Sequence, residues 1–456
     1  MYWVLDMSES GVTRRLAEFV VRTDFRDIPR DVVEHAKLCI LDWLGAALAG
    51  SRSLVAKVVI SFLEKFGWGD GVTVIGTPIR THPVFAALAN GVMGHAVEMD
   101  DIHREAIIHP AASIVPAALA VAEYGNAHGE EFITAVVLGY EIGIRLGIAV
   151  NPSHYEYWHT TGTCGTFGAA AAAGKLLKLS EEGMVHAFGI AGTSAAGLIE
   201  VFGTMSKPFN AGRAAMDGVL AAFLAKEGLT SSTTILESPK GYLRATSKEY
   251  NIDKLFKGLG KEFKIKENIF KIHASCGHTH GAIDAILEIV RRYNVKPGDV
   301  SEILIGTYPI AVEVVGRNYE PKTPEEAKFS LPYCVAVALL YGRVGLEEFS
   351  YSKLTDNEIR KLMKKVKIYI EPKYSNCVLG CAEVKIITKE GHIYEHRIDV
   401  PKGYPENPLT KQELLGKFEA LASIAISKER IKEIVNIIND LENRNIKELV
   451  TLLKPE

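Results

Sequence analysis

The first 265 residues of this 456-residue chain contain a series of apolar segments that have no polar face. Each is dense in Ala and Gly, and the series includes PVFAALANGVMGHAV, FITAVVLGYEIGIRLGIAV, GTFGAAAAAGKLL and AAMDGVLAAFLAKEG. A helix without a polar face is stable only when other elements surround it, and small side chains let helix axes approach closely. Residues 1–265 are therefore predicted to form a large all-helical domain with buried central helices.

The pattern changes near residue 265. Three segments alternate apolar with polar residues and are rich in β-branched types, as strands are: SEILIGTYPIAVEVV, KVKIYIEP and AEVKIITKEGHIYEHRIDV. Lys389-Glu390-Gly391 is predicted to be a hairpin turn. Helices are expected at 279–293, 323–341 and 355–364. Residues 266–404 are thus predicted to form a smaller α+β lid domain, so that the fold class is mostly α.

The last segment, residues 405–456, is predicted to form two helices, at about 410–424 and 427–453, that pack back on the helical domain. A chain of this length exceeds one ordinary core, which also favours two domains. The formal net charge is −3, so no basic excess indicates a nucleic-acid or membrane-surface partner. Asp6 and Glu9 interrupt the segment where a signal peptide needs an apolar run.

The six cysteines are scattered along the chain. With no leader segment expected, reduced thiols in a cytoplasmic protein are the simpler interpretation. The pair Cys377 and Cys381, in CVLGC, is too isolated to predict a metal site.

Two glycine- and histidine-containing segments are candidates for chemistry. Residues 94–112, GHAVEMDDIHREAIIHPAA, place carboxylates and histidines in a loop between two apolar helices, and His109-Pro110 precedes the second of these helices. His159 precedes TTGTCGTFGAAAAAG, where small residues open an Ala-rich helix. A helix N-terminus attracts an anion, and glycine permits close approach of the backbone. Both segments are predicted to face a substrate carboxylate.

A lysine and a histidine cluster complete the candidates. Pro208 is expected to hold Lys207 extended at the mouth of a helix capped by Asn210, which suits a carboxylate ligand. The stretch 271–289 crowds three histidines and Cys276 together. This leaves a zinc- or iron-dependent hydrolase, using that cluster with His103 and His109, as an alternative. A binding protein that has lost activity is a second alternative.

Six segments together, in order along the chain, resemble the MmgE/PrpD family: ILDWLGAALAG, HAVEMDDIHREAIIHPAA, HTTGTCGTFGAAAAAGKLL, MSKPFNAGRAAMDGVLAAFLAKEG, residues 271–284 and FSLPYC. The resemblance implies a helical domain with an α+β lid, a homodimer and no metal or organic cofactor. It also implies a pocket for a small polycarboxylate between the domains, formed by Asp100, Asp101, His109, His159, Lys207, Lys271, Cys276, His280 and Tyr333.

Family members dehydrate 2-methylcitrate, decarboxylate cis-aconitate or epimerise iminodisuccinate, and a 2-methylcitrate dehydratase-like lyase is the expected activity here. By the same resemblance, Cys276 occupies a position where the animal decarboxylases have a histidine. This difference disfavours decarboxylation. In the mechanism that the resemblance implies, Lys207 and Lys271 bind substrate carboxylates. His109 and His159 act as general base and acid. Asp100 or Asp101 fixes a histidine tautomer, Tyr333 donates to the leaving hydroxyl, and Cys276 and His280 contact substrate.

Overall fold

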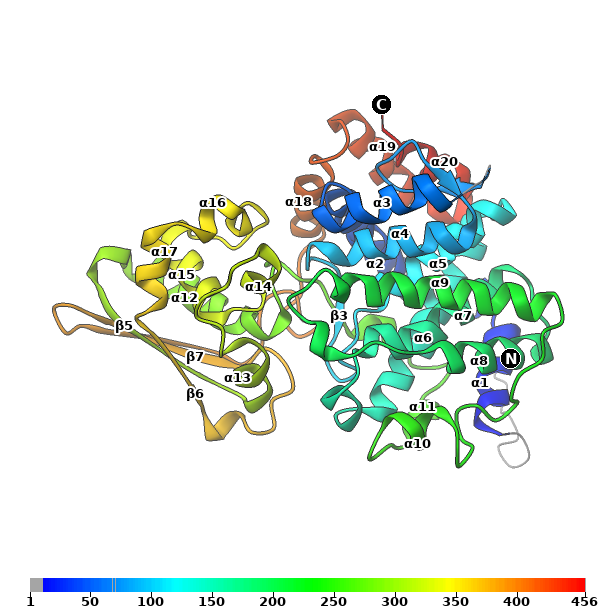
Figure 1. Ribbon diagram of the computed structural model, residues 1–456, viewed down its shortest axis with the longest axis horizontal. Helices are drawn as coiled ribbons and strands as arrows, with labels where there is room; N and C mark the ends of the chain where they lie inside the picture. The colour runs from blue at the N-terminus through cyan, green and yellow to red at the C-terminus, as the bar shows by residue number, and fades with distance from the viewer. Residues whose placement is uncertain (1–10, 68, 70, 456) are drawn as a thin grey trace.

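The computed structural model describes residues 11–67, 69 and 71–455, so Asp6 and Glu9 lie outside the described part. Figure 1 shows a larger helical body and a smaller body of helices and strands, joined along one side. The prediction of a mostly α protein with a smaller α+β part is confirmed. The C-terminal segment returns to the helical body, where the chain ends.

The helical body is built from nine longer helices and two short ones within the described residues. They are α1 (Val12–Arg22), α2 (Arg30–Gly50), α3 (Leu54–Phe66), α4 (Pro83–Ala96), α5 (Pro110–Gly125), α6 (Gly129–Val150), α7 (Thr160–Leu176), α8 (Glu181–Ser194), α9 (Ser206–Lys226), α10 (Tyr242–Thr246) and α11 (Asp253–Phe256). Helix α6 is long and apolar enough to cross a membrane by composition, but its whole apolar window is buried inside the protein. It is the central core helix.

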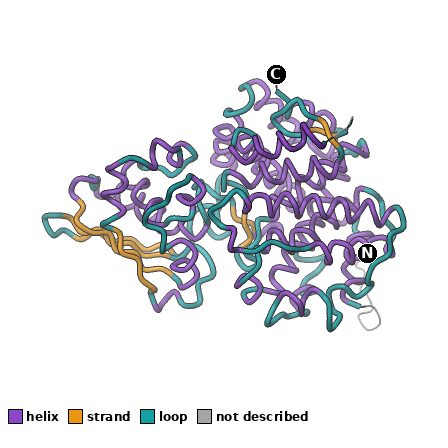
Figure 2. Tube along the Cα trace, viewed as in Figure 1, coloured by secondary structure: helices purple, strands orange, loops and turns teal. Residues whose placement is uncertain are grey.

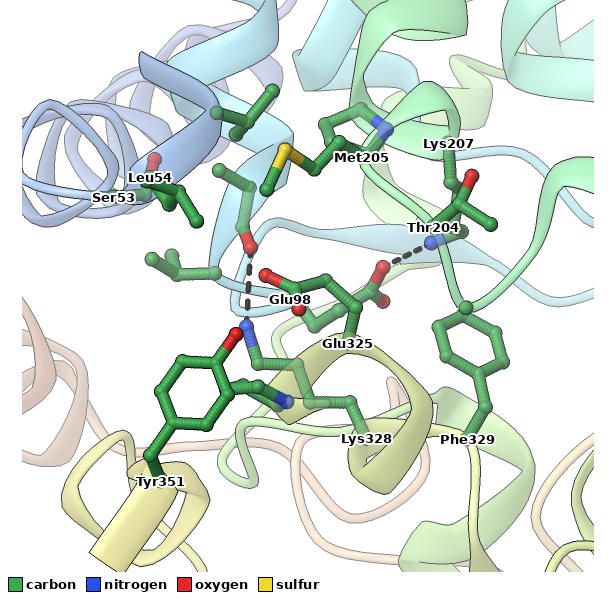
Figure 3. A pocket seen from close by; sticks show the side chains of 16 residues that line it. Ser53, Leu54, Glu98, Thr204, Met205, Lys207, Glu325, Lys328, Phe329 and Tyr351 are labelled. Atoms are coloured by element: carbon green, nitrogen blue, oxygen red, sulfur yellow. Dashed lines mark hydrogen bonds and ion pairs between the residues drawn. The ribbon is translucent and has the colours of Figure 1, made fainter. Parts of the chain in front are cut away.

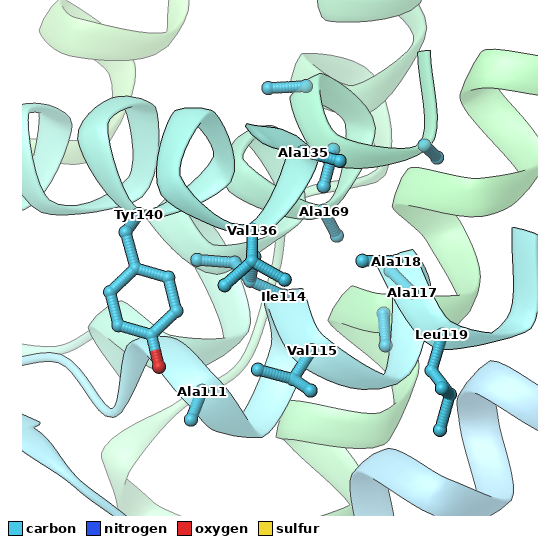
Figure 4. Close-up of a cluster of buried hydrophobic side chains, with 14 of the residues drawn as sticks. Ala111, Ile114, Val115, Ala117, Ala118, Leu119, Ala135, Val136, Tyr140 and Ala169 are labelled. Carbon is cyan, nitrogen blue, oxygen red and sulfur yellow. The ribbon is translucent and has the colours of Figure 1, made fainter. Parts of the chain in front are cut away.

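Small residues bring the central helices close together. A Cβ atom added at Gly91 on α4 would lie 2.7 Å from the Cα of Gly212 on α9, and one at Gly139 on α6 would lie 2.8 Å from the carbonyl oxygen of Gly168 on α7. Such distances leave no room for a side chain. Figure 4 shows the result around α5, α6 and α7, where Ala, Val and Ile side chains fill the narrow space between helices.

Two short antiparallel strand pairs fasten loops of the helical body. Strand β1 (Val72–Thr73) pairs with β2 (Arg80–Thr81), and β3 (Ile102–His103) pairs with β4 (Asn268–Ile269). The second pair ties the loop after α4 to the segment that enters the lid domain. These two parts of the chain lie more than 160 residues apart in sequence.

The lid domain is a four-stranded sheet with helices packed against it. The strand order is β6 (Val366–Ile370), β5 (Val300–Thr307), β7 (Ala382–Thr388) and β8 (Ile393–Ile398), with β5 and β6 parallel and the other pairs antiparallel. Figure 2 shows these strands in orange at the far end from the helical body. The helices are α12 (His280–Tyr293), α13 (Pro309–Val315), α14 (Pro324–Lys328), α15 (Leu331–Tyr341), α16 (Tyr351–Leu354) and α17 (Asn357–Met363).

The lid differs from the predicted elements in two places. The predicted strand 301–315 ends at Thr307, because Pro309 cannot donate to a sheet and instead begins α13. The predicted helix 323–341 is two helices, since Ser330 is an N-cap whose side chain accepts from the Tyr333 amide. The hairpin turn at 389–391 is confirmed, with Gly391 at φ 86°.

The C-terminal segment forms α18 (Lys411–Ala422), α19 (Lys428–Asn439) and α20 (Ile446–Leu452). The predicted helix 427–453 is therefore two helices, separated by a 3₁₀ turn at Leu441–Asn443. Helix α18 lies along α2, and Phe418 packs where Gly45 leaves space. Other 3₁₀ turns lie at Phe25–Asp27, Ser153–Glu156, Ile199–Val201, Lys264–Glu267, Gly277–Thr279, Pro297–Asp299, Glu347–Phe349 and Pro372–Tyr374.

Candidate active site

A small cavity of about 20 Å³ lies where the helical body meets the lid. Its lining comes from both bodies: Ile102, Ile107, His109, Tyr155, His159, Phe202, Lys207, Cys276, Gly277, His278, Phe329 and Leu379. A second cavity of about 230 Å³ adjoins it and shares Lys207 and Phe329 with it. Figure 3 shows this second cavity, with Glu98 and Lys207 on one side and Lys328 and Phe329 on the other.

Two of the cavity histidines occupy equivalent positions at helix starts. His109 is the N-cap residue of α5, which begins at Pro110, and His159 is the N-cap residue of α7. Both rings are buried, and each lies at the positive end of a helix dipole. The predicted helix starts after these residues are therefore present, and the geometry suits an anionic ligand.

Lys207 lies at the cavity, but its backbone does not have the predicted conformation. Helix α9 begins at Ser206, so Lys207 lies in its first turn rather than in an extended segment, and Asn210 lies inside the helix instead of capping it. Pro208 is tolerated there because first-turn amides have no partner within a helix. The Lys207 ammonium lies 5.5 Å from the ring centre of Phe202 and 5.1 Å from that of Phe329.

Glu98 joins the two lysines that are expected to bind substrate. Its carboxylate forms a short ion pair with Lys207, and Lys271 donates to its other oxygen at 3.2 Å. All three side chains are buried. Burial alone would raise the pKa of Glu98, but Lys207 and Lys271 hold it well below its usual range. The site therefore presents two cations that share one carboxylate.

Asp100 organises the imidazole groups. Its Oδ2 atom is 2.7 Å from Nδ1 of His95 and 3.3 Å from Nδ1 of His109. The ring centres of His95 and His109 are 4.6 Å apart, and His95 also stacks on His159 at 5.6 Å. Burial would raise the pKa of Asp100, but His95 and His109 lower it well below its usual range. Asp100 is therefore an ionised carboxylate that orients histidines.

Burial disfavours the charged forms of His109 and His159. Burial lowers the pKa of His109 to about 4, against the opposing effect of Asp100. Burial, reinforced by the Lys207 ammonium, lowers the pKa of His159 well below its usual value. Among the described residues, the buried Nε2 atom of His159 has no hydrogen-bond partner. A neutral imidazole with a free ring nitrogen, in a cavity that Lys207 also lines, can take a proton from a bound acid.

The low histidine pKa values predict that the protein loses stability in mild acid. The pKa values of His109, His154 and His278 are each about 4 in the folded protein, because burial disfavours their charged forms. Below about pH 6.5 the unfolded chain takes up protons that the folded chain does not, at about 1.4 kcal/mol per pH unit for each group. We expect urea midpoints to fall steadily from pH 7 to pH 4.5. Equal midpoints at pH 7 and pH 5 would contradict this assignment.

Five residues predicted to lie in the pocket line neither cavity: Asp100 and Lys271, which pair with His109 and Glu98, and three others, Asp101, Tyr333 and His280, whose polar groups have other protein partners. The Asp101 carboxylate accepts from the Tyr140 hydroxyl at 2.8 Å, the Ala111 amide at 3.1 Å and Asn268, so protein groups occupy it fully. Tyr333 donates to the Glu348 carbonyl at 2.7 Å within the lid core. His280 begins α12 and its Nε2 atom lies 3.3 Å from the Ser275 carbonyl oxygen. Their polar atoms are engaged in holding the fold.

The histidine cluster of the lid does not form a metal site with His103. His103 contacts Glu267, His273 contacts Asp284 and His278 contacts Tyr308. Across residues 11–67, 69 and 71–455, the one group of His, Cys, Asp and Glu atoms close enough to hold a metal ion is His95, Asp100 and His109, within 4.8 Å of one another. The constellation required by the metal-dependent hydrolase alternative is thus not assembled.

Several residues at the site were not singled out from the sequence. His95 lies in the last turn of an Ala- and Gly-rich helix. A histidine within such a buried segment was the one sequence feature that could have indicated its place at the site. Phe202 and Leu379 come from connecting segments with no local pattern of their own. Tertiary structure alone brings them to the cavity.

Cys377 and Cys381 form a disulfide, which corrects the expectation that all six cysteines are reduced. The other four are free and buried. Leu379, which lines the cavity, lies within the loop that the disulfide closes. The same loop is held at Gly380, whose amide donates to the Tyr308 hydroxyl at 3.0 Å.

A helical domain, an α+β lid and an acid–base site between them define the class of protein. One family model, described as the MmgE/PrpD N-terminal domain, matches residues 14–254, and another, the MmgE/PrpD C-terminal domain, matches residues 273–443. The chain belongs to the MmgE/PrpD family.

Relatives with assigned activities are lyases. The cis-aconitate decarboxylase of Aspergillus terreus (strain NIH 2624 / FGSC A1156) is 30% identical over 95% of this chain and 94% of its own length. The cis-aconitate decarboxylase of Homo sapiens is 29% identical over 93% and 90%. The 2-methylcitrate dehydratase of Escherichia coli (strain K12) is 22% identical over 75% and 74%. The chain is accordingly an enzyme with lyase-type activity.

Proposed function

We propose that the protein is a cofactor-independent lyase for a small tricarboxylate, and that decarboxylation of a cis-aconitate-like acid is its reaction. The observation that carries this proposal is the pair of buried lysines, Lys207 and Lys271, that share Glu98, with Lys207 in the wall of the cavity that His109 and His159 also line. Similarity to cis-aconitate decarboxylases over nearly the whole chain favours this reaction over dehydration, which the sequence analysis placed first.

The two cations and the imidazoles have separate tasks in this proposal. A substrate carboxylate competes with Glu98 for the ammonium group of Lys207 or Lys271. A buried ammonium must be paired with an anion, so it binds whichever carboxylate forms the stronger ion pair. The further negative charges of the acid then favour protonated histidine and raise the low imidazole pKa values. Loss of CO₂ leaves an electron pair on carbon, and the imidazolium of His159 or His109 delivers the proton that this carbon requires.

Dehydration of a 2-methylcitrate-like acid is the second candidate, and Cys276 supports it. Burial raises the pKa of the Cys276 thiol to about 11, so a neutral thiol stands in the cavity wall where the resemblance to animal decarboxylases implies a histidine. In a dehydration the neutral imidazole of His159 would remove the proton next to a carboxylate, and the imidazolium so formed would give that proton to the hydroxyl group, which leaves as water. The same residues would serve both reactions, and the substrate would decide between them.

A substrate panel tests both candidates together. Citrate, 2-methylcitrate, cis-aconitate and iminodisuccinate are each incubated with enzyme in D₂O and followed by proton NMR, with His159→Ala as the matched blank. Itaconate and CO₂ from cis-aconitate support decarboxylation. Loss of water from 2-methylcitrate supports the second candidate. Deuterium exchange or epimerisation of iminodisuccinate without either reaction would refute both, as would no change in any substrate.

We also propose that the enzyme is a homodimer that uses an exposed apolar row on α3. Leu54, Val58, Phe62 and Phe66 recur every four residues, and Val58 and Phe66 are 57% and 61% exposed. Patches of this kind mark association surfaces.

The dimer proposal predicts that Phe62→Glu yields monomers. A charge at the centre of the row cannot be buried without a partner, so association should weaken by a factor of about 100 or more. Light scattering after size-exclusion chromatography measures the mass. Ile393→Glu, at a position 62% exposed in the lid, is the matched control. A monomeric parent protein, or a Phe62→Glu variant that remains dimeric, would refute the use of this surface.

A further inference from the structure

The C-terminal segment contacts the loop that carries the catalytic carboxylates. Lys417 on α18 donates from Nζ to the carbonyl oxygen of Met99 at 2.7 Å. Met99 lies between Glu98, which pairs with the two lysines, and Asp100, which orients the histidines. The side chain of Lys417 is 7% exposed and does not line either cavity at the site.

We propose that Lys417 is a positioning residue that fixes the Met99 peptide, and thereby both neighbouring carboxylates, in the geometry the reaction needs. It acts through the loop and does not touch substrate. The consequence for turnover rests on the proposed function. The effect on the geometry of the histidine cluster does not depend on the proposed function and can be measured separately.

The loop needs such a restraint because its backbone is unfavourable on its own. Glu98 adopts φ 58°, in the left-handed region that is unfavourable for a residue with a side chain. One end of the loop is held by Lys328 of the lid, which donates to the Ala96 carbonyl at 3.1 Å. Lys417 holds the other end. Two lysines from distant segments therefore fix the peptide groups on both sides of Glu98.

A second contact explains why the restraint is a lysine. The Nζ atom of Lys417 is 2.6 Å from Oδ1 of Asp42, a carboxylate buried in α2. Burial raises the pKa of Asp42 to about 6, and Lys417 opposes that rise. The ammonium thus balances a buried negative charge while its remaining hydrogens are free to bind Met99.

Helix α18 is rigidly placed, so the ammonium has little freedom. Leu414, Phe418 and Leu421 are buried, and Phe418 fits against Gly45, where an added Cβ would lie 3.1 Å from its ring. The packing of α18 against α2 therefore fixes the position of Lys417, and Lys417 in turn fixes the loop that it binds. Displacement of a catalytic group by about 1 Å can lower turnover about 100-fold.

Four variants test the proposal. Lys417→Met should lower kcat about 10- to 100-fold and also lower the melting temperature, because Asp42 is left unpaired. The double variant Lys417→Met/Asp42→Asn removes that charge and should recover the melting temperature while kcat stays low. Lys417→Arg keeps a cationic donor and should recover most of the turnover. Lys411→Met, on the same helix but bonded, among residues 11–67, 69 and 71–455, only to the Asn439 side chain, is the control.

The double variant separates positioning from simple stability. Recovery of full kcat together with the melting temperature would overturn the proposal, as would an equal loss of kcat in Lys411→Met. The imidazole ¹⁵N signals of His95 and His109 give a readout that needs no substrate. They should shift in the double variant and not in Lys411→Met; unchanged signals would overturn the proposal even if every substrate in the panel proved inert.

Discussion

Replacing His159 by alanine is expected to reduce turnover about 10²- to 10⁴-fold, the range typical of losing a general acid or base. His159 lines the cavity together with Lys207, its Nε2 atom has no hydrogen-bond partner in the described part of the chain, and its one side-chain hydrogen bond there is to Asn210 at 3.4 Å, although its ring also packs against His95 and Phe202. Because so little of the fold depends on that ring, the variant should keep its melting temperature within a few degrees. The measurement is kcat on the acid that the panel identifies.

The control for this experiment is His392→Ala, since the His392 side chain is 63% exposed at the lid hairpin and far from the cavity in the fold. It should retain full activity. Near-complete turnover by His159→Ala would remove His159 from the mechanism and leave His109, which is oriented by Asp100, as the proton-transfer group.

Replacing Lys207 by methionine is expected to raise KM and lower kcat, so that kcat/KM falls about 100-fold or more. A charge-assisted contact to a carboxylate contributes about 1.5–3 kcal/mol, and Lys207 is also placed to stabilise the charge that develops during reaction. Glu98 would keep only Lys271 as a partner, so the melting temperature should fall as well. Steady-state kinetics over a wide substrate range separates the two constants.

The matched control is Lys226→Met, because Lys226 ends the same helix and its Nζ donates to the Leu177 carbonyl, away from the site. A second comparison, Glu98→Gln, leaves both lysines without their shared carboxylate. If Lys207→Met bound every polycarboxylate with an unchanged KM, Lys207 would have no role in substrate binding, and Lys271 alone would remain as the candidate.

The sequence predicted the framework well because its signals are local. Ala- and Gly-rich segments without a polar face had to be surrounded helices, and the histidines at positions 109 and 159 were expected to precede helices because Pro110 and the small residues after His159 favour a helix start. The lid strands were predicted from alternation. Errors came where a proline or a cap ended an element, as at Pro309 and Ser330.

The candidate site was only partly predictable, because its contacts join residues far apart in the chain. Glu98 lies 109 positions from Lys207 and 173 from Lys271, and no sequence pattern shows that one carboxylate serves both lysines. The sequence placed Asp100 and Asp101 together as equivalent candidates. Asp101 is buried and accepts hydrogen bonds from Tyr140 and Asn268, so its role is structural. Asp100 instead contacts the histidines.

The sequence by itself thus determined which segments are buried helices, that a smaller α+β part accompanies them and which residue types could bind and protonate an acid, since these depend on periodicity, capping and side-chain chemistry. Only the tertiary structure decided which carboxylate pairs with which cation, which histidines are held neutral and which segments close the cavity. Those outcomes depend on burial and on distances of a few ångströms between distant segments, and neither is encoded in local sequence spacing.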